Sequence, residues 1–282
     1  MNKAGDIRET AVKALEEHGF LFQKRCVDEV RSLGGRYRVE SEEYPVSIGL
    51  EDTVIDFVLR MLDTGRTYVV FECKRANPEY VFWVFPASSL TPAPRRQFLM
   101  TTVGHLVHAP TKAVVQTHEC HIFGGDPPHF VDMGLEVSRG KRTQGKSGRT
   151  ENIYAACTQV LTGVGGLANE RKKRMDPNAP QTYFYIPVVI TSADLFVTRY
   201  KPIDVDLKTG SIPLEKAETQ AVDWVIYDFP VPEPLQVTPR EDSMSTLVGP
   251  DDGYRRLFKL KSIAIVRSTS VAQFLQQLKS PD

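Results

Sequence analysis

Apolar side chains recur along the chain with two spacings, one typical of helices and one typical of strands. Helical spacing is found at 7–18, 20–33 and 151–170, and again after Ser268. Strand-like runs are found at 36–46, 54–62, 67–74, 183–191, 195–200, 222–229 and 262–267. Because helices and strands alternate in this mixed order, the chain is expected to form an α/β fold, with a mixed β-sheet flanked by helices.

The pattern contains no linker long enough to divide the chain, so one domain is expected over residues 1–282. Residues 75–150 follow neither spacing clearly and are expected to form an insertion in that domain. Residues 230–256 are rich in Pro, Asp and Ser, which predicts a long loop.

Composition narrows the class of protein without identifying it. The chain has 282 residues, of which 41% are hydrophobic and 25% charged, with a formal net charge of zero. It has neither the roughly 20-residue apolar run that spans a bilayer nor an N-terminal signal core, and its four cysteines are spread singly. We therefore expect a reduced, cytoplasmic protein without a membrane partner. A nucleic-acid partner would have to bind a local basic patch.

Three charged side chains interrupt the two apolar strands at 54–62 and 67–74: Asp56, Glu72 and Lys74. The sequence between these strands predicts a three-residue hairpin turn that ends in a left-handed Gly65. Counting outward from this turn places Asp56 opposite Glu72, on the face that also carries Lys74. A loop longer by one residue would move Asp56 to the other face.

Two carboxylates at directly opposed positions, about 5 Å apart at Cβ, repel each other unless a cation lies between them. Lys74 supplies one positive charge, and a divalent metal with oxygen ligands, such as magnesium, would supply more. The alternative is a plain cross-strand ion pair at an exposed sheet edge. Apolar side chains are expected on both faces, with Ile55 and Phe57 on one and Val58 on the other. That pattern favours an interior strand, where a charge requires a reason.

An Asp in one strand, followed by Glu-x-Lys at the end of the next antiparallel strand, resembles the PD-(D/E)XK nuclease superfamily, whose fold is called restriction-endonuclease-like. The matching residues are Asp56 and Glu72-Cys73-Lys74. The preceding order of helix, strand and hairpin matches over residues 15–75, and the helix at 151–170 with the strand after it continues the match.

The resemblance implies a metal-dependent endodeoxyribonuclease, a hydrolase that cleaves phosphodiester bonds in DNA and serves in restriction, defence or repair. Asp56, Glu72 and the backbone carbonyl of Cys73 would bind Mg2+, or Mn2+ in its place. Lys74 would orient the attacking water and stabilise charge on the phosphate. Because many members of the family work as dimers, a homodimer is compatible with this assignment.

One expected residue differs from the family pattern. Members often carry a Glu in the first helix, facing the site, and the matching position here is Gln23, a polar residue within an apolar helix face. The substitution lowers the negative charge of the site and bears on whether it holds one metal or two. A Gln in the later helix is also common in the family. Gln159 is the candidate, although it lies away from the apolar stripe of that helix.

A second motif competes with this interpretation. Residues 140–147, GKRTQGKS, fit the phosphate-binding pattern GxxxxGK[ST], but no continuous apolar strand leads into them and a glycine follows in the first turn of the helix that the motif requires. The same segment is basic and could grip a DNA backbone as a flexible loop, or it could be an exposed loop without a ligand. Its candidate DNA-binding residues are Arg139, Lys141, Arg142, Lys146 and Arg149.

Three functions therefore remain open from the sequence. The first is the magnesium-dependent nuclease. The second is a catalytically inactive nucleic-acid-binding protein of the same fold, for which Gln23 is the best support. The third is a nucleotide-binding module that uses residues 140–147.

Overall fold

The computed structural model describes residues 3–48, 51–76, 81–88, 102–107, 113–118, 129–138, 151–174, 183–230 and 260–279, and the statements below concern these. The helices are α1 (Lys3–Glu17), α2 (Phe20–Ser32), α3 (Glu151–Arg174) and α6 (Val271–Gln277). The first seven strands are β1 (Tyr37–Ile48), β2 (Glu51–Met61), β3 (Thr67–Lys74), β4 (Val81–Ser88), β5 (Thr102–Val107), β6 (Ala113–His118) and β7 (His129–Val131). The others are β8 (Leu135–Ser138), β9 (Phe184–Thr191), β10 (Asp194–Tyr200), β11 (Glu218–Val222), β12 (Trp224–Pro230) and β13 (Leu260–Arg267).

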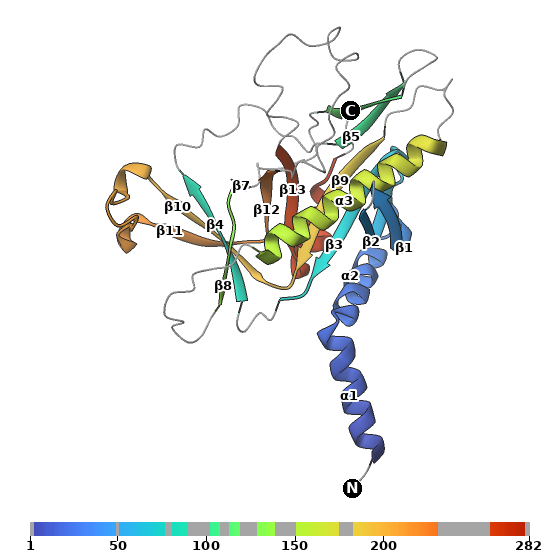
Figure 1. Cartoon of the computed structure of the whole chain (residues 1–282), viewed down its shortest axis with the longest axis horizontal. Coiled ribbons are helices and arrows are strands. Elements are labelled where there is room, and N and C mark those ends of the chain that lie inside the picture. The colour runs from blue at the N-terminus through green and yellow to red at the C-terminus, as the bar shows by residue number, and fades with distance from the viewer. Residues whose placement is uncertain are drawn as a thin grey trace.

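A mixed seven-stranded sheet forms the centre of the fold, in the order β1-β2-β3-β9-β13-β12-β7. Strands β1, β2 and β3 are antiparallel neighbours, whereas β3, β9 and β13 run parallel. A second sheet of four strands, β11-β10-β4-β8, lies at one end, and β5 and β6 form a separate pair (Figure 1). The predicted α/β fold with a mixed sheet flanked by helices is confirmed.

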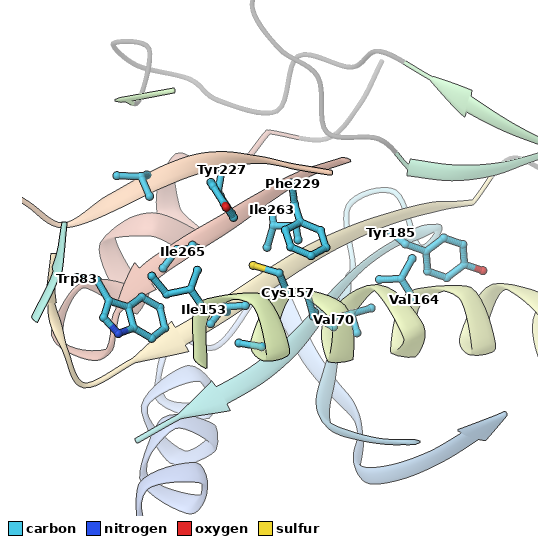
Figure 2. Close-up of a cluster of buried hydrophobic side chains, with 14 of the residues drawn as sticks. Val70, Trp83, Ile153, Cys157, Val164, Tyr185, Tyr227, Phe229, Ile263 and Ile265 are labelled. Atoms are coloured by element: carbon cyan, nitrogen blue, oxygen red, sulfur yellow. The ribbon is translucent and has the colours of Figure 1, made fainter. Parts of the chain in front are cut away.

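Helices cover both faces of the central sheet. Helix α3 runs across one face (Figure 1), and Figure 2 shows its Ile153, Cys157 and Val164 directed at side chains of β3, β9, β12 and β13. Side chains of the four-stranded sheet, such as Trp83, belong to the same hydrophobic cluster. The opposite face packs against α2 and α6 in a second cluster, which includes Phe274. The strands between these layers are therefore apolar on both sides, as the sequence predicts.

Two glycines let α3 approach the sheet closely. A Cβ atom at Gly163 would lie 2.8 Å from Cγ1 of Ile55, and one at Gly166 would lie 2.5 Å from Cβ of Val46. Both distances are shorter than carbon atoms tolerate. The missing side chains bring the backbone of α3 down onto β1 and β2, and this fixes where the polar residues of the helix meet the sheet.

The predicted hairpin register is confirmed, with a shorter ladder than expected. Strands β2 and β3 pair from Phe57 with Phe71 to Arg60 with Tyr68, which is the register that the turn predicts. Gly65 has a left-handed φ of 62°. Leu62 does not continue the ladder, because its N–H donates to the carbonyl of Arg36 at 2.9 Å.

The predicted helices and strands are present, with shifted ends, and two features were missed. Strand β11 was not expected, and several short strands lie within 75–150, where the sequence pattern gives no clear reading. In the part of the chain that the structure describes, no helix is both long and apolar enough to cross a bilayer. Whether residues 1–282 act as one domain stays a prediction, and most of 230–256 lies outside the described residues.

Candidate functional site

Glu72 and Lys74 lie at the end of β3, on the face covered by α3. The Lys74 ammonium lies 2.7 Å from Oε1 of Glu72 and donates to Oε1 of Gln159 at 2.6 Å. Glu72 is only 4% exposed. Gln159 comes from the third turn of α3, so the helix and the strand jointly hold the lysine. A plain ion pair at an exposed sheet edge does not describe this arrangement, because β3 lies inside the sheet between β2 and β9.

Asp56 approaches the same point from β2. Its Oδ2 accepts a hydrogen bond from the backbone N–H of Cys73 at 2.5 Å, and its backbone carbonyl accepts one from Nε2 of Gln23 at 3.2 Å. Gln23 is buried in α2, on the other side of the sheet. The amide therefore contacts the backbone of Asp56, rather than serving the acidic role of the glutamate that the family resemblance places at this position.

Burial disfavours the charged forms of the Glu72 and Asp56 carboxylates. Burial, and then the nearby charge of Asp56, raise the pKa of Glu72 from its ordinary 4.5 to about 7, against the opposing effect of Lys74. Burial likewise raises the pKa of Asp56, although the N–H of Cys73 and the Lys74 ammonium oppose the shift. One lysine does not compensate both acids, so the site favours a second positive charge.

The site offers two carboxylates rather than a closed metal cage. Among the described residues, no three His, Cys, Asp or Glu side chains lie close enough together to hold a metal ion. Magnesium is commonly bound by one or two carboxylates, with waters and substrate phosphates completing the shell. Asp56 and Glu72 are the carboxylates that could hold it, and magnesium binding stays a prediction. The Cys73 carbonyl as a further ligand stays a prediction.

The prediction that Ile55 and Phe57 lie on the same face of β2 was wrong. Ile55 does not share a face with Phe57: it packs against α3, whereas Phe57 belongs to the cluster under α2. Residues two apart in a regular strand point to the same side, so β2 changes its alternation at Asp56. The hairpin pattern could not reveal this irregularity, because it depends on the neighbouring strand β1.

Sequence reasoning missed one residue beside the site and gave too little weight to one residue of the site. Glu43 of β1 lies near enough to raise the pKa of Asp56, and nothing in the pattern of β1 singles it out. The sequence offers Gln159 as a candidate although it lies off the apolar stripe of its helix. Its side chain contacts Lys74 instead of packing in the core, which explains a polar residue at this position.

The candidate DNA-binding residues, Arg139, Lys141, Arg142, Lys146 and Arg149, lie outside the described residues, as does the whole GKRTQGKS segment. Their proposed contacts with DNA and the competing nucleotide-binding role both stay predictions.

Comparison with known proteins does not assign the chain to a family. The chain matches no protein-family model, no curated protein and no solved structure. Its function must therefore be argued from the geometry of its own residues.

Proposed function

We propose that the protein is a magnesium-dependent nuclease that hydrolyses phosphodiester bonds in DNA. The observation that carries the proposal is the Lys74 ammonium held between Gln159 and Glu72, with Asp56 as the second nearby carboxylate; the pKa values of both acids are raised. An amine beside paired acids is suited to a reaction in which negative charge develops on a phosphate. The resemblance of Asp56 and Glu72-Cys73-Lys74 to the PD-(D/E)XK pattern supports the same reaction.

Each residue has a distinct task in this proposal. Asp56 and Glu72 would hold Mg2+, which when bound supplies Lewis-acid polarisation and a water of lowered pKa. Lys74 donates a proton in a hydrogen bond to the attacking water or to a phosphate oxygen, and stabilises the charge that grows there. Gln159 accepts from Lys74 and keeps its ammonium group aimed at the reacting atoms.

A binding protein without catalysis is the second candidate, and one observation favours it. Position 23 is a glutamine whose amide donates to the carbonyl of Asp56, so it does not supply the additional acid that active members of the family often carry. This candidate predicts that DNA binds without being cut, and that Asp56 and Glu72 are not required for metal uptake.

The deciding experiment incubates supercoiled plasmid with the protein in Mg2+, in Mn2+ and in EDTA. We expect nicked and linear products with either metal, none with EDTA, and a loss of at least a hundredfold for Glu72→Gln. Ligase should reseal the nicks, because the resemblance implies 5′-phosphate and 3′-hydroxyl ends. Cleavage that survives Glu72→Gln would contradict the proposal. DNA binding without cleavage in any metal would favour the second candidate.

A further inference from the structure

Strands β1 and β2 break their regular alternation at the same level. In β1, Glu42 forms an ion pair with Lys24 of α2, whereas Tyr44, two residues later, packs against the cluster under α3. In β2, Phe57 packs on the α2 face and Ile55, two residues earlier, packs on the α3 face. Residues two apart should share a face, so the pleat is interrupted in both strands.

The interruption lies between Glu43 and Asp56. Glu42 pairs with Phe57 and Tyr44 pairs with Ile55. Glu43 and Asp56, which lie between these two pairs, do not form a pair of their own. Glu43 has a φ of 46°, and among the described residues it is the one non-glycine residue with a positive φ. A side chain with a Cβ rarely adopts this conformation, so the surrounding structure must impose it.

At this break, the backbone carbonyl and the side-chain carboxylate of Asp56 each accept a hydrogen bond from a different neighbour. The carbonyl accepts from the Gln23 amide, which reaches up from α2. The pairing of β2 with β3 ends at Phe57, and beyond it the N–H of Cys73 donates to the Asp56 carboxylate. A carboxylate standing on a regular pleat would point away from the plane of the sheet, whereas this one lies against a backbone donor of the next strand.

We propose that this break is a positioning device for Asp56, made by the left-handed backbone of Glu43 and secured by the Gln23 amide. Both are positioning residues, because they act through Asp56. The device also accounts for glutamine at position 23: its amide is a donor toward the Asp56 carbonyl, whereas a carboxylate would oppose that carbonyl with another acceptor. The catalytic purpose of the device rests on the proposed nuclease function, but its geometry does not.

The test uses variants of Glu43 that separate backbone from charge. Glu43→Gly and Glu43→Asn accept a positive φ, and Glu43→Gln removes the charge with little change in shape. Glu43→Val strongly disfavours a positive φ. The readouts are hydrogen exchange of the Cys73 amide, Mn2+ affinity by calorimetry, and kcat and KM for plasmid cleavage.

We expect Glu43→Val to exchange the Cys73 amide at least tenfold faster and to bind Mn2+ at least tenfold more weakly, with a lower kcat and a similar KM. The Gly, Asn and Gln variants should stay within about threefold of the wild type. Exchange of the Cys73 amide at the wild-type rate in Glu43→Val would overturn the proposal. So would Asn and Gln variants that lose as much as Val, since the carboxylate would then be responsible.

Gln23→Met provides a second route if Glu43→Val does not fold. It keeps the length of the side chain and removes the donor, so faster exchange at Cys73 is expected, and unchanged exchange would contradict the role of the amide. The exchange measurement does not require activity. If the wild-type protein is inactive but both variants show faster exchange at Cys73, the nuclease proposal is refuted and the positioning role stands. If the wild-type protein is active but the Cys73 amide exchanges at the wild-type rate in both variants, the positioning role is refuted and the nuclease proposal stands.

Discussion

Lys74 donates a hydrogen bond to Gln159 across 85 residues of sequence, with 2.6 Å between Nζ and Oε1. This contact ties the end of β3 to α3 and holds the amine beside Glu72. It makes the orientation of Lys74 dependent on a helix that the strand pattern alone does not bring to the site.

Removing the acceptor should therefore impair catalysis more than binding. We expect Gln159→Leu to lower kcat for plasmid cleavage about tenfold, because an ammonium held by Glu72 alone is less well oriented to stabilise the developing charge. KM and Mn2+ affinity should change little. Gln273→Leu, at an exposed position of α6, is the matched control. Equal kcat values for the two variants would remove Gln159 from the site.

Lys74→Met is expected to reduce cleavage by about 10²–10³ at saturating Mg2+, because the neutral side chain cannot stabilise charge on the phosphate. The comparison variant is Lys13→Met, which removes an exposed lysine paired with Glu9 on α1. It should cut plasmid at the wild-type rate. Circular dichroism checks that both proteins are folded. Cleavage by Lys74→Met at the rate of the control would show that the amine is not part of the mechanism.

Stability of the metal-free protein should depend on pH through Glu72. Because its folded pKa of about 7 lies above the ordinary 4.5, the folded state keeps a proton that the unfolded chain releases between these values. The free energy of unfolding should fall as pH rises through this window, by about 3 kcal/mol. Glu72→Gln should lack this fall.

The measurement is urea unfolding from pH 4 to 8 in EDTA, with the difference between wild type and Glu72→Gln taken at each pH. Comparing the two proteins cancels the titration of groups that do not interact with Glu72. Mg2+ should restore stability to the wild type at pH 8 and should have little effect on the variant. A difference that does not vary with pH would mean that Glu72 is not held in a charge-disfavouring environment.

Gly163→Ala should destabilise the protein, although alanine favours helices. Its Cβ would lie 2.8 Å from Cγ1 of Ile55, and overpacking of this kind costs about 1–3 kcal/mol. Ile55→Ala removes the opposing atoms, so the double variant should be more stable than the sum of the two single effects predicts. Thermal and urea unfolding of the four proteins measures this coupling. Simple additivity would contradict the close approach of α3 to β2.

Some of the site could be predicted from sequence because it depends on short-range rules. A turn ending in Gly65 sets the register of the hairpin, and the ladder from Phe57 with Phe71 to Arg60 with Tyr68 follows it. Alternation along β3 then places Glu72 and Lys74 on one face. These relations involve neighbouring residues and one tight turn, so few alternative arrangements compete with them.

The other half of the site was decided by tertiary packing. Gln159 reaches Lys74 because glycines on α3 let the helix settle against β1 and β2. Asp56 leaves the regular pleat because of Glu43 in the adjacent strand and Gln23 in a helix on the far face. Such contacts join segments distant in sequence, and no local periodicity encodes them. The chain by itself determined which residues lie on the hairpin; only the packed structure decided which polar groups they meet.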